Sequence, residues 1–238
     1  MNQIKYFFVS TTLLLLLGLS FLNSSPKQES IVEMNTSQIM QTLFALEENG
    51  KTFANLPKTT QVYIQSKKEI NLGWYRLSAL PKSFGKLQSI EVLFLHKNYF
   101  TQMPEVLGEL KNLKKLHFML NPLQSLSESI GNLKKLEFLN LPYNRLKTLP
   151  NSIGKLENLT FLDLHNNQIT HLPESMGQLR SLEKLYINNN QLKSLPNSIG
   201  KLKNLRELHI GGNEFSPEEI QKIRMLLPNC SISTEAGF

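Results

Sequence analysis

The chain contains almost no cysteine. Cys230 is the only one among 238 residues, so no disulfide can form within the chain. An exported protein without disulfides depends on its apolar core alone. A thiol becomes reactive beside an activating base or a helix dipole, and nothing around Cys230 supplies either, so we expect this residue to pack in the core.

The sequence also lacks the motifs of an enzyme. No glycine-rich phosphate loop is present, and Asp163 near His165 has no accompanying nucleophile or oxyanion-binding arrangement. Four of the five histidines fall on one predicted face, but only His96 and His117 could be neighbours, and no third ligand is near them. We therefore expect no enzymatic activity, no metal and no cofactor.

An apolar run occupies residues 7–22, preceded by Lys5 and the terminal amine. Its 16 residues suit the core of a signal peptide and are slightly short for a membrane-spanning helix. Small residues permit cleavage after Ser20, with Ser24 as a second choice, and the lack of a nearby cysteine argues against a lipoprotein. We predict a signal peptide at 1–25 and a secreted or cell-surface protein. The alternatives are an uncleaved anchor with the protein facing the periplasm, or a buried core helix.

Repetition dominates the rest of the chain. The frame Leu-x-x-Leu-x-Leu-x-x-Asn-x-Leu returns every 23 residues, and its six regular copies begin at Ile90, Leu113, Leu136, Leu159, Leu182 and Leu205. Repeats at such a period form a solenoid, and this frame is the leucine-rich repeat signature. Leucines on one side of each short strand face the core. The asparagine that follows can both donate to and accept from backbone groups of neighbouring turns.

The second half of each unit reads Leu-Pro-x-Ser-Ile-Gly-x-Leu and is too short for a full α-helix, so we expect a 3₁₀ or irregular turn. Proline sets the turn, and glycine is expected to let the chain reverse. Ser127 stands where the other units have proline, and Pro142 removes an N–H at the end of a strand. Local irregularity is therefore expected in the second and third repeats.

The two ends differ from the repeats. Residues 26–66 are predicted to form an N-terminal cap, with a helix near 37–48 that begins at Thr36 or Ser37, ends at Asn49-Gly50 and covers the end of the solenoid. Residues 67–215 hold one degenerate and six regular repeats. Residues 216–238 are predicted to form a C-terminal cap helix and an edge strand. The apolar face of that helix would contain Ile220, Ile223, Met225, Leu226 and Leu227.

The chain resembles the leucine-rich repeat proteins of pathogenic spirochaetes, the leptospiral type with 23-residue units. The likeness rests on the Leu-Pro-x-Ser-Ile-Gly-x-Leu frame and on the ending at 215–232, and it covers about residues 56–232. It implies an α/β solenoid, a leucine-rich repeat arc with a concave parallel β-sheet, short convex 3₁₀ or irregular turns and helical caps. It also implies export and a role in contact with proteins or the host matrix.

Outward-facing strand residues form the predicted binding site. The core does not require aromatic side chains there, and an exposed aromatic strip rimmed by polar groups marks a partner site. The alternative is a surface ladder in which Phe138 and Phe161 shield one another. Seven strands would provide roughly 450–500 Å², less than the ~800 Å² of a standard interface, so the loops would have to contribute. We predict that a protein partner, a host or matrix protein, contacts Trp74, Phe94, His96, His117, Met119, Phe138, Asn140, Tyr143, Phe161, Asp163, His165, Tyr186, Asn188 and His209.

The formal charge of +7 suggests a second surface. Basic residues recur just before the strands, with Glu157 interrupting the row, at Lys111, Lys134, Arg180 and Lys203. Such a row could bind a polyanion such as a sulfated glycan, although Glu91, Glu137 and Glu183 are expected to neutralise part of it. Polyanion binding and an envelope scaffold are therefore alternatives. We do not expect nucleic acid, we expect membrane contact only through residues 7–22, and the oligomeric state stays open.

Overall fold

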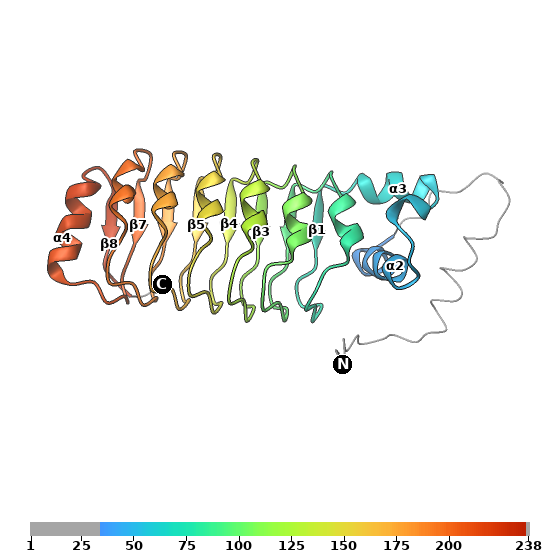
Figure 1. Ribbon diagram of the computed structural model, residues 1–238, viewed down its shortest axis with the longest axis horizontal. Coiled ribbons are helices and arrows are strands. Elements are labelled where there is room, and N and C mark those ends of the chain that lie inside the picture. The colour runs from blue at the N-terminus through green and yellow to red at the C-terminus, as the bar shows by residue number, and fades with distance from the viewer. Residues whose placement is uncertain (1–33, 237–238) are drawn as a thin grey trace. The chain divides into compact units, whose positions relative to one another are not determined.

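A computed structural model describes residues 34–236, and the predicted signal peptide lies outside this range. The chain divides into two compact units, with the boundary between Ile64 and Gln65. The larger unit contains the repeats, whose strands lie side by side in chain order (Figure 1).

The smaller unit contains helix α2 (Thr36–Glu48), 3₁₀ helix η2 (Phe53–Asn55) and nearly all of helix α3 (Lys58–Gln65). The prediction of Thr36 or Ser37 as the N-cap of α2 is wrong. The cap is Asn35, whose side chain accepts from the Gln38 N–H, while the Gln38 side chain accepts from the Asn35 N–H, each at 2.9 Å. Asn49 ends the helix and Gly50 follows at φ +64°.

Helix α3 was not anticipated, because its β-branched Thr59, Thr60, Val62 and Ile64 favour a strand. The degenerate repeat follows this helix, and its strand begins at Glu69, inside the range 67–215 expected for the repeats.

The larger unit contains one sheet of eight parallel strands in the order of the chain. This arrangement confirms the predicted solenoid. The strands are β1 (Glu69–Asn71), β2 (Val92–Phe94), β3 (Lys115–His117), β4 (Phe138–Asn140), β5 (Phe161–Asp163), β6 (Lys184–Tyr186), β7 (Glu207–His209) and β8 (Ser231–Ser233). Their central residues pair in register, as Leu93 does with Leu116, and those of β1 to β7 are buried.

Six 3₁₀ helices form a second row alongside the strands (Figure 1). They are η3 (Lys82–Lys86), η4 (Glu105–Glu109), η5 (Glu128–Asn132), η6 (Asn151–Lys155), η7 (Glu174–Gln178) and η8 (Asn197–Lys201). Each has five residues, and the second half of the repeat is therefore 3₁₀, one of the two conformations predicted for it. The N-cap residue of these helices is proline in five cases and Ser127 in the sixth.

The expected irregularity in the second and third repeats is absent. The Ser127 hydroxyl accepts from the Ser129 N–H at 2.9 Å, which caps η5 in place of the missing proline. Pro142 disturbs no ladder bond, because the bonds between strands at this depth come from Leu141 and Tyr143, which donate to carbonyls of the next repeat at 2.9 and 3.2 Å. The N–H that proline lacks has no role in the sheet.

The recurring glycine of the 3₁₀ helices allows neighbouring repeats to approach closely. The prediction that it lets the chain reverse is wrong. A Cβ on Gly131 would lie 2.7 Å from the carbonyl oxygen of Ser152, the equivalent serine of the next repeat. Real Cβ atoms essentially never come so near. Gly200, in the last repeat, has more room, since its nearest neighbour would be Leu226 at 3.3 Å.

The asparagine after each strand connects its own repeat to the preceding one, as predicted. Asn167 accepts from the Leu146 N–H at 3.0 Å and donates to the Leu141 carbonyl at 3.0 Å and the Leu164 carbonyl at 2.9 Å. The same bonds recur at Asn98, Asn121, Asn144, Asn190 and Asn213. Each asparagine therefore satisfies backbone groups that the turns would otherwise bury unpaired.

Helix α4 (Pro217–Leu226) follows the last repeat, and the hydroxyl of Ser216 caps it by accepting from the Glu219 N–H at 3.2 Å. Met225 was predicted to lie on the buried face of this helix. It is instead 68% exposed. Cys230 lies just before β8, and burial raises the pKa of its thiol to about 11, with the Glu207 carboxylate contributing. The thiol therefore stays protonated, but Cys230 is only half-buried and does not lie in the core as expected.

Candidate partner-binding face

Two columns of side chains flank the buried centre of the strands and form the outer face of the sheet. The register places them as predicted. The first column contains Val92, Lys115, Phe138, Phe161, Lys184 and Glu207, and the second contains Phe94, His117, Asn140, Asp163, Tyr186 and His209.

Seven aromatic and imidazole rings cross this face in an unbroken series, which we call the ring ladder. Its members are His96, Phe94, His117, Phe138, Phe161, Tyr186 and His209. Phe138 and Phe161 stack with ring centroids 4.3 Å apart and planes 4° apart. This pair was predicted. The rest of the series was not, because it passes from the second column to the first and back, which depends on side-chain torsions.

The ring ladder is already ordered by its own contacts. Phe94 stacks on His117 with centroids 4.5 Å apart, and Phe161 meets Tyr186 edge-on at 5.2 Å. Pairs of this kind each contribute about 0.5–1.5 kcal/mol beyond the burial of area. Because these side chains are already ordered, the ring ladder would lose little side-chain entropy when a partner binds.

Glu207 anchors the C-terminal end of the ring ladder. Its carboxylate accepts from the Tyr186 hydroxyl at 2.7 Å, lies 2.8 Å from Lys184 Nζ and lies 2.9 Å from His209 Nε2. The Lys184 ammonium, and then these other bonds, lower the pKa of Glu207 to about 2. Burial and the bond to Glu207 raise the pKa of Tyr186 to about 12.

The predictions of Asp163 and Asn188 as exposed contact residues are wrong. Asp163 is 7% exposed because its carboxylate bonds back to His165, at 3.0 Å to the backbone N–H and 2.6 Å to Nδ1. Asn188 is 1% exposed. The structure gives Asp163 and His165 a local bonding role, and Tyr143 packs edge-on against His165 at 5.0 Å.

Burial lowers the pKa of two ring-ladder histidines, His96 and His117. Positive charge on His96 and Lys115 lowers the pKa of His117 further. These two histidines are therefore neutral near pH 7. Within residues 34–236, no group of three or more histidine, cysteine, aspartate or glutamate side chains could hold a metal ion.

The basic row before the strands is partly tied to the protein itself. Lys111 donates to the Gly108 carbonyl at 2.6 Å, and Lys134 donates to the Lys155 carbonyl at 2.9 Å and pairs with Glu157 at 3.4 Å. Arg180 and Lys203 are exposed.

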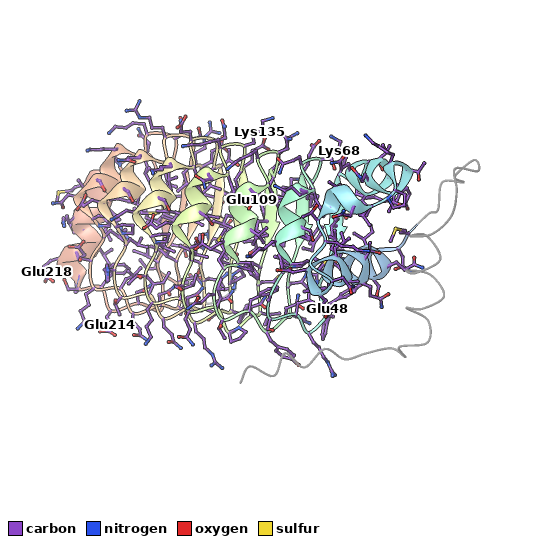
Figure 2. The ribbon with its side chains drawn as sticks, turned by 45° about the vertical axis from the view of Figure 1, so that its right-hand side comes forward. Glu48, Lys68, Glu109, Lys135, Glu214 and Glu218 are labelled. Atoms are coloured by element: carbon purple, nitrogen blue, oxygen red, sulfur yellow. The ribbon has the colours of Figure 1, made fainter. Side chains whose placement is uncertain are left out.

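Of the glutamates expected to neutralise this row, Glu91 has other partners. Glu91 pairs with Lys114 at 2.8 Å and with Lys68 at 2.7 Å, and these lysines lower its pKa to about 2. Figure 2 shows Lys68 and Lys135 at this edge of the repeats and Glu214 at the opposite edge.

The opposite edge carries a feature that sequence reasoning missed. One residue per repeat, just before the asparagine position, has a left-handed backbone. These residues are Trp74, Lys97, Leu120, Tyr143, Asn166, Asn189 and Gly212, with φ between +52° and +68°. Their 23-residue spacing is visible in the sequence, but their varied side chains concealed a shared backbone conformation.

Comparisons with known proteins agree with this architecture. The family described as "Leucine-rich repeat region" matches residues 123–227. A leucine-rich repeat protein of Leptospira interrogans is similar to the chain, with 36% identity, a TM-score of 0.57 and coverage of 75% of this chain and 51% of that one. This is a leucine-rich repeat protein of the leptospiral type.

This leucine-rich repeat protein also resembles more distant structures. An internalin of Listeria monocytogenes has a TM-score of 0.61 and 21% identity, covering 77% of this chain and 52% of that one, a likeness that concerns the fold alone. The chain thus spans about half the length of the solved structures it matches. No curated protein matched the sequence. In residues 34–236, no helix has the length and apolar character needed to cross a membrane.

Proposed function

We propose that this protein is an exported, non-enzymatic binding module that holds a protein partner on the outer face of its sheet. The ring ladder is the observation that carries the proposal. Its rings lie on the side of the sheet opposite the core leucines, so packing of the solenoid does not require them. Aromatic residues are enriched where protein interfaces carry most of their binding energy.

The outer face of the strands is too small to form a standard interface by itself. Eight strands of three residues cover roughly 340 Å² at the usual strand spacing and rise, below the sequence-based value because the strands are short. A standard interface buries about 800 Å² on each partner. The partner would therefore extend from the ring ladder onto the loops, where Trp74 and Tyr143 are exposed.

The test uses the full-length protein, immobilised and titrated with purified host matrix and plasma proteins. The double variant Phe138→Asp/Phe161→Asp places two charges at the centre of the ring ladder. We expect saturable binding to one partner to fall at least tenfold, consistent with a central hot spot. Lys155→Asp, on the exposed 3₁₀ row, is the matched control and should bind like the parent. Equal binding by the parent and the double variant would exclude this face.

Polyanion binding through Lys111, Lys134, Arg180 and Lys203 is the second candidate, favoured by the exposed Arg180 and Lys203. It predicts that affinity for a sulfated glycan falls steeply with salt. The bonds that hold Lys111 and Lys134 to backbone carbonyls make it the weaker of the two. An envelope scaffold retained by residues 7–22 is a third arrangement, and fractionation would distinguish it.

A further inference from the structure

The edge of the repeats that follows the strands combines exposed aromatic residues with positive charge. Five large apolar side chains of the repeat unit are more than a third exposed here. They are Trp74 at 67%, Tyr99 at 57%, Tyr143 at 50%, Tyr75 at 42% and Leu120 at 37%. All lie in the loops that follow strands β1 to β4. We call this surface the loop edge.

The loop edge has charge of one sign only. Its four loops, residues 73–81, 96–104, 119–127 and 142–150, contain no aspartate or glutamate. They contain the basic residues Arg76, Lys97, Arg145 and Lys147, all exposed. The edge before the strands differs, because glutamates there pair with lysines. Within these four loops, no acidic residue accompanies the basic ones.

Backbone conformation indicates that the turn does not require these apolar side chains. Trp74, Leu120 and Tyr143 have positive φ, which disfavours side chains with a Cβ. The same position in later repeats is filled by Asn166, Asn189 and Gly212, residue types that tolerate this conformation. The bulky residues of the first repeats are thus retained against the local preference, and residues held in this way cluster at functional sites.

We propose that the loop edge docks on an anionic phospholipid surface. Tryptophan and tyrosine favour the boundary between water and lipid, where their apolar rings and polar groups are both satisfied. Leu120 would enter the acyl boundary, a role that neither base stacking nor glycan binding provides. Nearby basic side chains would contact the headgroups, each strengthening partition about fivefold. Loops at successive strand spacings form a line, which suits a flat surface.

The loop edge differs from the membrane segment and from the polyanion-binding row that were expected from the sequence. Residues 7–22 were the only segment expected to contact lipid, and the row beginning at Lys111 lies at the other edge. The proposal also does not depend on the ring ladder. Phe138→Asp/Phe161→Asp should therefore leave binding to vesicles unchanged while weakening capture of a protein partner at least tenfold.

Trp74 provides a direct test, because it is the only tryptophan of the chain. The full-length protein is titrated with phosphatidylcholine vesicles, with and without phosphatidylglycerol, while tryptophan emission is recorded. We expect a blue shift with the anionic vesicles alone. Absence of a shift, or an equal shift with neutral vesicles, would overturn the proposal. A shift with heparin or a single-stranded oligonucleotide, but none with anionic vesicles, would overturn it in favour of a soluble polyanion.

Variants separate the loop edge from residues 7–22, which are present in every protein compared. Leu120→Asn/Tyr143→Asn introduces the residue found at Asn166 and Asn189, so the turn is preserved. It should weaken partition to anionic vesicles by about tenfold. Arg145→Gln/Lys147→Gln should weaken it about 25-fold and flatten its dependence on salt. If both variants partition like the parent, another segment carries the lipid contact and the assignment is wrong.

Discussion

Asparagine shows how one residue can organise a repeat. Its side-chain amide both donates and accepts, so a single residue satisfies an N–H and two carbonyls in neighbouring turns. Leucine at the same position would fill similar space and offer neither function. The buried groups would then lose their partners, which costs more than an ordinary hydrogen bond contributes.

Asn167→Leu is therefore expected to lower the free energy of unfolding by about 1–3 kcal/mol. The groups left unpaired would be the Leu146 N–H and the Leu141 carbonyl. Chemical denaturation followed by circular dichroism measures the change. Gln168→Leu, one residue further on, is the control and should have little effect. A negligible effect of Asn167→Leu would contradict the role assigned to the amide.

Single residues also show which features could be predicted from the sequence and which could not. The 23-residue period predicted the strands, the asparagine bonds and the adjacency of Phe138 and Phe161. It did not predict that Asp163 turns back to His165, because that depends on a side-chain torsion. The apolar pattern of the C-terminal cap helix placed Met225 on a buried face, but Met225 is exposed, because apolar spacing alone does not show which side chains are covered.

Among the elements, the 3₁₀ helices pack more closely than a Cβ at their glycine allows. Gly131 lies against the backbone of the next repeat, whereas Gly200 lies beside the flexible side chain of Leu226. The two glycines occupy the same position in their 3₁₀ helices, and neither has a positive φ. They therefore separate the effect of close approach from that of glycine itself.

Gly131→Ala should destabilise the protein by about 1–3 kcal/mol, because the added methyl forces two repeats apart. Gly200→Ala should be close to neutral, since its mild crowding is offset by the reduced freedom of the unfolded chain. Thermal unfolding of the two variants and the parent provides the comparison. Equal losses of stability in both would show that close approach is not the reason for glycine here.

The elements were predicted unevenly. The strands and 3₁₀ helices repeat, so each copy supported the others. Helix α3 has no second copy, and it was not predicted, because its β-branched residues favour a strand. The left-handed turns repeat as well, but side chains as different as Trp74 and Gly212 share one backbone conformation, so the letters of the sequence concealed it.

For the whole molecule, acid should act in two stages. The lowered pKa values of His96 and His117 mean that the folded state favours the neutral rings. Their contribution to stability is complete above the ordinary histidine value of 6.5 and is lost as pH falls through the lowered values. Glu91 and Glu207, with pKa near 2, contribute above the ordinary value of 4.5 and lose that contribution as pH falls towards 2.

The free energy of unfolding measured against pH should therefore decline first below pH 6.5 and again below pH 4.5. His117→Phe retains a stacking ring but removes the titrating group, so it should reduce the first decline and leave the second intact. An identical pH profile in this variant would show that His117 does not contribute to the first stage.

The asparagine bonds also give the coil a direction of assembly. Each asparagine reaches back to groups that precede it by 21 and 26 residues, so a turn acquires its full set of bonds only when the next repeat follows. A chain that emerges from a ribosome or a translocation channel with its N-terminus first can add turns one at a time. Each incoming repeat then locks the turn before it, and the growing end is the only turn left incomplete.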